Sequence, residues 1–249
     1  MTFDSREIQA NFRSLSENSY VGRGFVVGLD ESGNMIQVYW LMGRSAGSRN
    51  RVFDLDEGRV FTKSADGSVP DNPELTLYNA MDERRCGYYV VSNGAQTDDL
   101  CQALKNRVQH AFRHTLLRWS YEPDPNHTPR ITAVAHWMGN RFEVEMALLR
   151  KSATSDDCDR AWYMYGNIPL GTGYCMTTYM GDGDPLPSFR GEPYLMPLNG
   201  TGEQIASTYW AALNRHNRVA LVVKTISIRT ANTEVHVINA HEMKTASTT

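Results

Sequence analysis

Strand-like runs that occur in pairs, joined by short turns, constrain the fold of this chain more than any other feature. The runs are rich in β-branched and aromatic residues, and polar or Gly-containing turns separate the two members of each pair. Neighbouring strands with such short connections pair antiparallel. The pairs are residues 20–29 with 35–42, 130–137 with 142–150 across Gly139 and Asn140, and 218–229 with 234–240. Further strands are expected at residues 51–61, 88–91, 161–165 and 174–179.

Only two long segments carry the apolar period of an amphipathic helix. They are residues 97–119, the clearer of the two, and residues 202–216. Shorter helices are expected over residues 4–17, with Asp4 as the N-cap, and over residues 74–82. A few helices among many hairpins favour an α+β fold in which antiparallel sheets are covered by helices. The chain has neither an internal repeat nor a long linker, which favours a single domain. The apolar face of the first helix consists of Leu100, Leu104, Val108, Ala111, Phe112 and Leu116.

The composition excludes several classes of protein. Hydrophobic residues make up 41% of the 249 residues and charged residues 21%, as in ordinary globular proteins. With a net charge of -3, the chain has no overall basic field to attract nucleic acid, so any phosphate must be bound by local Arg residues or backbone amides. No apolar run approaches the ~20 residues of a membrane-spanning helix, and the first residues are polar. We therefore expect a soluble cytoplasmic protein without nucleic-acid or membrane partners.

The cysteines give no sign of a metal site. Cys86, Cys101, Cys158 and Cys175 form no C-x-x-C pair, and no His stands beside them at ligand spacing. Free thiols, some of them packed in the core, are the expected state.

A Gly/Ser loop rich in Arg is the first candidate for binding a ligand. Arg44 follows Gly43, and Arg49 and Arg51 come soon after. Several Arg side chains on such a loop can hold a phosphate through bidentate hydrogen bonds. The same pattern also suits a solvated basic loop, and the residues alone leave both interpretations open.

Two further clusters lie next to the first long helix. Residues 92–98 follow a buried strand and open that helix, so they can form either a polar-ligand site or an ordinary helix start. Tyr121, Glu122, Asp124 and Arg130 lie between the helix and the next strand, where they suit acid–base chemistry or simple turn formation. The Gly-rich segment 171–189 is long for a compact domain, which is typical of a binding loop.

Three motifs, in this order and spacing, resemble the archaeal-type inosine monophosphate (IMP) cyclohydrolases. They are Tyr20-Val-Gly-Arg-Gly, the run VVSNGAQTD at residues 90–98, and Tyr-Glu-x-Asp-x-x-x-Thr-Pro-Arg-Ile at residues 121–131. The later segment 173–193 is similar to the bacterial branch of that family. The resemblance implies a four-layer αββα sandwich of the N-terminal-nucleophile-hydrolase type over residues 20–249, preceded by a helical extension at residues 1–19. It also implies that no amino-terminal nucleophile is needed, in agreement with the polar N-terminal segment.

The resemblance implies an enzyme of purine biosynthesis, a hydrolase acting on cyclic amidine C–N bonds. Its reaction is the dehydrative ring closure of formamidoimidazole-carboxamide ribonucleotide (FAICAR) to IMP. The carboxamide nitrogen of the substrate attacks its own formyl carbon and water leaves, so the reaction implies neither a metal nor another cofactor. The expected partner is a purine nucleotide substrate.

The resemblance implies matches for individual residues. Arg44 corresponds to the Arg of the family's Arg-Ser loop, Tyr78 to the Tyr of its Tyr-Asn dipeptide, and Glu122 to the Glu of its Tyr-Glu motif. We expect Tyr78 to donate to the formyl oxygen, Glu122 to orient the substrate or act as a base, and Arg44 to act as an electrostatic clamp. Residues expected to shape the pocket or hold ribose and phosphate are Arg49, Arg51, Asn93, Thr97, Asp98 and Arg130.

Two alternatives remain at this point. A paralogue could bind a purine nucleotide on the same fold without closing the ring, since a fold does not fix a function. An amidohydrolase would need a processed N-terminal Cys, Ser or Thr. The sequence leaves the oligomeric state open and is compatible with a homo-oligomer.

Overall fold

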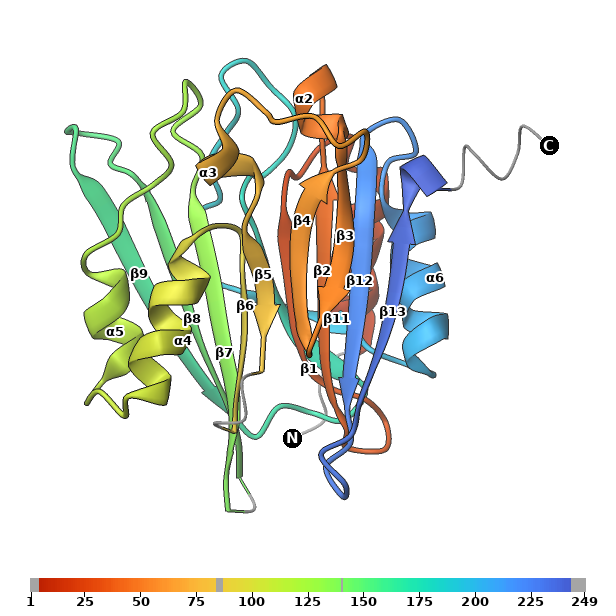
Figure 1. Ribbon diagram of the computed structural model, residues 1–249. Coiled ribbons are helices and arrows are strands. Elements are labelled where there is room, and N and C mark those ends of the chain that lie inside the picture. The colour runs from red at the N-terminus through yellow and green to blue at the C-terminus, as the bar shows by residue number, and fades with distance from the viewer. Residues whose placement is uncertain (1–4, 84–86, 140, 243–249) are drawn as a thin grey trace.

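Two antiparallel sheets lie face to face in the computed structural model, which describes residues 5–83, 87–139 and 141–242 (Figure 1). The six-stranded sheet has the order β11-β10-β1-β2-β12-β13, and the seven-stranded sheet runs from β3 to β9 in sequence order. The strands of the six-stranded sheet are β1 (Gly24–Leu29), β2 (Met35–Met42), β10 (Thr172–Thr177), β11 (Tyr194–Pro197), β12 (Arg218–Ile226) and β13 (Thr233–Asn239). Those of the seven-stranded sheet are β3 (Arg51–Asp56), β4 (Arg59–Ser64), β5 (Asn79–Asp82), β6 (Tyr88–Ser92), β7 (Arg130–Met138), β8 (Arg141–Lys151) and β9 (Cys158–Gly166).

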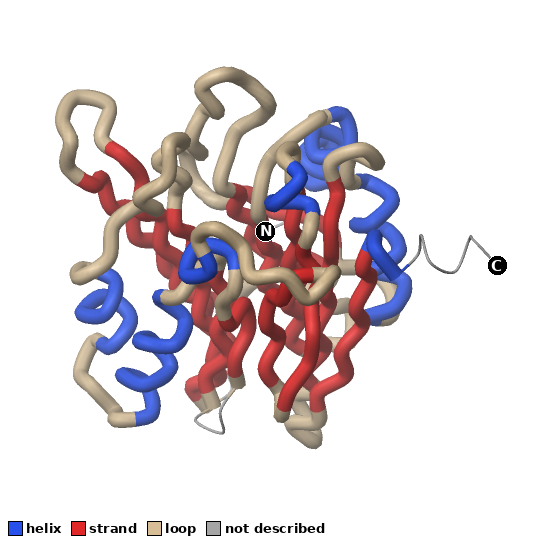
Figure 2. The backbone as a smooth tube through the Cα atoms, turned by 45° about the horizontal axis from the view of Figure 1, so that its top comes forward, coloured by secondary structure: helices blue, strands red, loops and turns tan. Residues whose placement is uncertain are grey.

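Helices cover the outer faces of both sheets (Figures 1 and 2). α1 (Ser5–Glu17) and α6 (Gly202–Ala212) pack on the six-stranded sheet, whereas α4 (Gln96–Lys105) and α5 (Ala111–Leu116) pack on the seven-stranded sheet. The short helices α2 (Ala46–Arg49) and α3 (Pro73–Thr76) lie in connections at one end of the sandwich. This confirms the α+β, four-layer αββα arrangement. No helix of the described residues is long and apolar enough to span a membrane.

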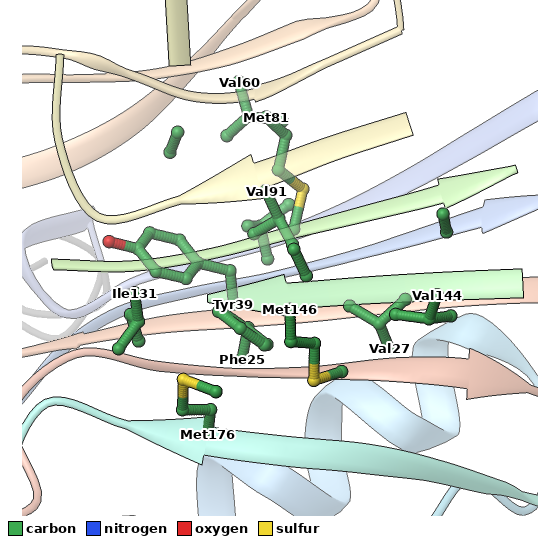
Figure 3. Close-up of a cluster of buried hydrophobic side chains, with 14 of the residues drawn as sticks. Phe25, Val27, Tyr39, Val60, Met81, Val91, Ile131, Val144, Met146 and Met176 are labelled. Atoms are coloured by element: carbon green, nitrogen blue, oxygen red, sulfur yellow. The ribbon is translucent and has the colours of Figure 1, made fainter. Parts of the chain in front are cut away.

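The main core fills the space between the sheets (Figure 3). Phe25 and Tyr39 of one sheet meet Val91 and Met146 of the other, and all four are fully buried. Alternate residues of β2, such as Trp40, point to the opposite face and pack under α6. Because both faces of β2 are buried, its sequence is almost continuously apolar. The two cores hold the strand ends, and the loops that follow them, in fixed positions.

The three predicted hairpins are confirmed as β1/β2, β7/β8 and β12/β13. The predicted helices at residues 4–17 and 202–216 are confirmed within a few residues at the ends that are described. α6 begins at a capping box, in which Thr201 accepts from the backbone of Gln204. Asp4, Asn140 and Cys86 lie outside the described residues.

The prediction of one helix over residues 97–119 was wrong. The chain leaves the helical path after α4, with left-handed φ values of 54° at Arg107 and 52° at His110, and then forms α5. Phe112 and Leu116 still pack on the same sheet as Leu100, so the apolar spacing continues across the break. Val108, which a single helix would have buried, is 42% exposed.

Other element boundaries also differ from the prediction. The helix expected at residues 74–82 is α3 followed by β5, which lies between β4 and β6 in the sheet. The strand expected at residues 51–61 is a hairpin of β3 and β4, which turns at Glu57 and Gly58, both at positive φ. The short helix α2 occupies part of the expected Gly/Ser loop.

Candidate active site

A cavity of about 400 Å³ is lined in part by residues of α2 and α3. Figure 1 shows these two short helices at one end of the sandwich. The cavity wall combines five segments that are far apart in sequence: the residues before β1, the α2 loop, the α3 region, the loop between α5 and β7, and the loop between β10 and β11. Lining residues with polar or aromatic side chains include Tyr20, Arg23, Arg44, Ser45, Ser48, Arg51, Asn72, Glu122, Asp124, Thr128 and Tyr179.

A buried ion pair lies at the floor of this cavity. Arg23 Nη1 donates to Glu122 Oε1 at 2.9 Å, and Arg23 Nη2 donates to Glu122 Oε2 at 2.7 Å. The same Nη1 also donates to the carbonyl oxygen of Asn93, and both charged side chains are at least nine-tenths buried. Burial lowers the pKa of Arg23, but the charge and hydrogen bonds of Glu122, together with Tyr78 and Tyr39, raise that pKa well above its usual range. The pair is therefore a buried, doubly hydrogen-bonded group on the cavity wall.

The geometry before β1 depends on a glycine. Gly22 has a φ of 71°, and a Cβ atom there would lie 2.2 Å from Thr178 Oγ1. A side chain at this position would be strained and would clash. Gly22 therefore allows the chain to turn sharply and to direct Arg23 toward Glu122.

Arg130 adds a second buried cation beside Glu122. Its Nη1 donates to Gln96 Oε1 at 2.9 Å and lies 3.7 Å from Glu122 Oε1. The guanidinium stacks 4.8 Å from the ring centroid of Trp119, and its Nε has no hydrogen-bond partner among the described residues. Burial lowers the pKa of Arg130, although Glu122 opposes that effect. Glu122 thus lies between two guanidinium groups.

The strand-to-helix segment 92–98 lies behind this cluster and not on the cavity wall. Asn93 is fully buried: its Oδ1 accepts from the backbone of Ile131 and its Nδ2 donates to the carbonyl of Pro129. Thr97 Oγ1 hydrogen-bonds to Ser92 Oγ. Asp98 is exposed and accepts from Asn79, away from the cavity. Asn93 and Thr97 therefore hold the backbone around Arg23 and Arg130 in position.

Tyr78 is buried next to the ion pair. Its hydroxyl is 2.7 Å from that of Tyr39, which comes from the opposite sheet, and either oxygen can be the donor. Tyr78 also lies close enough to Arg23 to help raise the pKa of that guanidinium. Burial, followed by the neighbouring Tyr78, raises the pKa of Tyr39 well above its usual range. The two hydroxyls therefore form a buried pair that borders the charged cluster.

The three Arg residues of the α2 loop have different environments. Arg44 is half-exposed, lines the cavity and pairs with Asp182 at 2.6 Å. Arg51 also lines the cavity but is buried, and its Nε donates to the carbonyl of Ser48. Arg49 is directed elsewhere, where it donates to the carbonyl of Gly43 and to Asn217. Arg44 and Arg51 are therefore the cavity's cations on this side.

Sequence reasoning missed several residues that the structure brings to the cavity. Arg23 lies within the Tyr20-Val-Gly-Arg-Gly motif. This motif indicated the family, but it did not indicate a role for Arg23 at the site. Tyr20 and Tyr179 stack at 6.0 Å between centroids, and the guanidinium of Arg44 covers the Tyr20 ring at 5.1 Å. Thr128 Oγ1 lies 2.6 Å from the hydroxyl of Tyr179 and donates to Asp124. These residues make a rigid aromatic and polar side wall.

Comparison with known proteins identifies the family of this chain. Residues 20–231 match the model of a family described as IMP cyclohydrolase-like protein. The chain belongs to this family. The matched range contains every cavity residue named above.

Similar proteins in this IMP cyclohydrolase-like family come from archaea. The chain is 31% identical over 186 residues to the IMP cyclohydrolase of Methanopyrus kandleri, a match that covers 69% of the chain and 89% of that protein. It is 33% identical over 117 residues to the IMP cyclohydrolase of Natronomonas pharaonis, covering 46% of the chain and 58% of that protein. With the protein of that name from Thermococcus kodakarensis it is 31% identical over 125 residues, which cover 49% of the chain and 59% of the relative.

Proposed function

We propose that this chain is an IMP cyclohydrolase, which closes the second ring of FAICAR to give IMP and water. The observation that carries the proposal is the buried Arg23–Glu122 pair at the floor of an Arg-lined cavity, with Arg130 beside Glu122, in a chain of the IMP cyclohydrolase-like family. The cavity volume of about 400 Å³ lies in the range that small-molecule ligands occupy. Fixed charges and hydrogen-bond donors around a reacting group are what an intramolecular condensation needs.

In this reaction the nucleophile is part of the substrate, so the protein does not have to supply one. Its work is to hold the carboxamide nitrogen near the formyl carbon, to move protons and to stabilise charge on the formyl oxygen. Both oxygens of Glu122 already accept from Arg23, which supports an orienting role for this carboxylate toward the carboxamide N–H groups. If Tyr39 donates to Tyr78, the proton of Tyr78 remains available for the formyl oxygen.

For the anionic end of the substrate we propose the α2 side of the cavity. Arg44 and Arg51 are its cations there, and Ser45 and Ser48 offer hydroxyl groups beside them. Because Asp182 pairs with Arg44, a bound phosphate would replace that carboxylate as the partner of the guanidinium.

Arg44→Ala is expected to weaken substrate binding by about 1.5–3 kcal/mol, the cost of one charge-assisted hydrogen bond. Isothermal titration calorimetry with a purine mononucleotide measures this change directly. Arg59→Ala is the matched control, because Arg59 is also a partly exposed arginine paired with a carboxylate, Asp56, but lies outside the cavity wall. Unchanged binding for Arg44→Ala, Arg51→Ala, Arg49→Ala and the triple variant would move the phosphate site elsewhere.

Chelators and thiol reagents are expected to leave turnover intact. The described residues contain no group of three His, Cys, Asp or Glu side chains placed to hold a metal ion, and burial raises the pKa of Cys175 to about 12. Activity is measured after EDTA treatment and, separately, after alkylation, with the melting temperature as a control for unfolding. Loss of activity on chelation that one added metal restores would contradict the noncovalent, metal-independent mechanism.

The test of the proposed function is an assay with FAICAR, followed by the absorbance change as IMP forms. Conversion by the protein, lost in Glu122→Gln, supports cyclohydrolase activity. Tight binding of the nucleotide without conversion would instead identify a non-catalytic binding protein on the same fold.

Several finer assignments belong to the same proposal. We infer membership of the bacterial branch, the N-terminal-nucleophile-hydrolase type of sandwich and a cytoplasmic location from the sequence resemblance and the proposed pathway. We likewise keep the division into a helical extension at residues 1–19 and one domain at residues 20–249. A homo-oligomer is compatible with the sequence, and light scattering measures that state.

A further inference from the structure

Two arginine–carboxylate pairs lie at the Arg-lined cavity, and they differ in exposure. Arg23 and Glu122 are at least nine-tenths buried, whereas the side chains of Arg44 and Asp182 are 39% and 42% exposed and pair at 2.6 Å. Arg44 lines the cavity but Asp182 does not, so the carboxylate reaches the guanidinium from outside the wall. Exposed pairs of this kind contribute little free energy, so an anion with a higher charge can replace the carboxylate.

The loop between β10 and β11 presents Asp182 at an exposed tip. The base of the tip is tied together by Met180, whose backbone N–H donates to the carbonyl of Pro187 at 2.9 Å. Asp182 Oδ1 accepts from Arg44 Nη1 at 2.6 Å and from the backbone N–H of Gly183 at 3.0 Å. Arg44 Nη1 also donates to the carbonyl oxygen of Gly183 at 3.0 Å. The tip therefore offers Arg44 two oxygen acceptors close together, as a phosphate group would.

Residues just before β1 hold this tip in place. Asn18 Nδ2 donates to the carbonyl oxygen of Met180 at 2.9 Å, and Ser19 Oγ donates to Asp182 Oδ2 at 3.4 Å. Both residues precede the range 20–231 that matches the family model. The support for the Asp182 tip therefore comes in part from outside the matched range.

The charge of Asp182 acts on the cavity wall. Burial raises the pKa of the Tyr20 hydroxyl, and Asp182 raises it further, against the effect of three arginines. Those arginines are Arg23, Arg51 and Arg44. All four charged groups are therefore close enough to act on one side chain of the wall. A phosphate bound at Arg44 and Arg51 would be repelled by Asp182 unless the carboxylate moved away.

We propose that Asp182 occupies, in the free protein, the position at Arg44 that the substrate phosphate takes on binding, and that it thereby lowers the affinity for purine nucleotides. The inference rests on the proposed function, in which Arg44 and Arg51 bind the anionic end of the substrate. Ring closure leaves the phosphate unchanged, so contacts with it stabilise the substrate, the transition state and the product alike. Such uniform binding does not raise kcat, and it slows release of the product. By competing for Arg44, Asp182 keeps this uniform binding small and favours release of IMP.

Asp182→Asn tests the competition, because it removes the charge but keeps an acceptor oxygen for Arg44. The variant should bind IMP about two- to fivefold more tightly, which corresponds to the strength of an exposed ion pair. Inosine, which has no phosphate, should bind the variant and the wild-type protein equally. Calorimetry measures both ligands. The KM for FAICAR should fall by the same factor as the Kd of IMP, with kcat unchanged or lower.

Asp184→Asn is the matched control. Asp184 is an exposed acid of the same loop, and it makes no ion pair or side-chain hydrogen bond with the described residues. Its substitution changes the net charge by the same amount as Asp182→Asn, so it should leave IMP binding nearly unchanged. The melting temperatures of both variants show whether the fold is retained.

Three results would overturn the role of Asp182: unchanged or weaker IMP binding in Asp182→Asn, an equal gain in Asp184→Asn, or an equal gain for inosine. Together with conversion of FAICAR by the wild-type protein, any of these results would reject this role alone. A gain in IMP binding without conversion of FAICAR would support the competition while rejecting the cyclohydrolase. Absence of both conversion and IMP binding would reject both proposals.

Discussion

Glu122→Gln is expected to lower kcat by about 10²–10⁴-fold and to destabilise the fold by about 3–5 kcal/mol. Glutamine keeps the shape of the side chain but not its charge. Arg23, at least nine-tenths buried, would then face a neutral amide in place of the carboxylate that now accepts at 2.7 and 2.9 Å. Arg130 would lose the same neighbour. Steady-state kinetics and urea denaturation measure the two effects separately.

A double variant separates charge imbalance from catalysis. Arg23→Gln combined with Glu122→Gln removes both members of the buried ion pair, so it should recover part of the stability that Glu122→Gln loses. It should remain inactive, because the charged cluster at the cavity floor is gone. A stably folded Glu122→Gln protein with near-normal turnover would show that the active site lies elsewhere.

Local patterns in the sequence predict the layers of this fold well, because hairpin strands carry their own turn signals. The β1/β2 pair needs only a polar turn between two apolar runs, and both are visible in the sequence. The break between α4 and α5 has no such signal. It depends on left-handed backbone conformations at Arg107 and His110, and neither residue type is a signal for such a conformation. Meanwhile Phe112 and Leu116 continue the helical period of apolar residues. Only the packing on the sheet determines where that helix ends.

The candidate site was less accessible from sequence than the fold. Glu122 and Tyr78 emerged through family motifs, since nothing in the local pattern indicates that residues so far apart border one buried cluster. Arg23 illustrates the limit: an arginine between two glycines gives no sign that it pairs with Glu122, 99 residues later. Arg49 shows a second limit, because proximity in sequence to Arg44 does not direct its side chain into the cavity. Side-chain direction in a loop depends on contacts such as that with Asn217.

Tyr78→Phe is expected to lower kcat by about 10²–10³-fold with little change in KM, as for the loss of other oxyanion donors. The hydroxyl would matter most as charge builds on the formyl oxygen, so its loss falls on the transition state rather than on substrate binding. Tyr39→Phe is the matched control, because it breaks the same 2.7 Å hydrogen bond but leaves the hydroxyl of Tyr78 in place. If the bond is only structural, both variants should lose equal stability and equal activity.

The combination of Tyr78→Phe with Glu122→Gln tests whether the two residues serve one step. Tyr78 borders Arg23, which in turn holds Glu122, so removing one group alters the setting in which the other acts. The loss in kcat of the double variant should therefore be smaller than the product of the two single losses. Fully multiplicative losses would mean that the residues act independently, and near-normal turnover of Tyr78→Phe would remove the tyrosine from the mechanism.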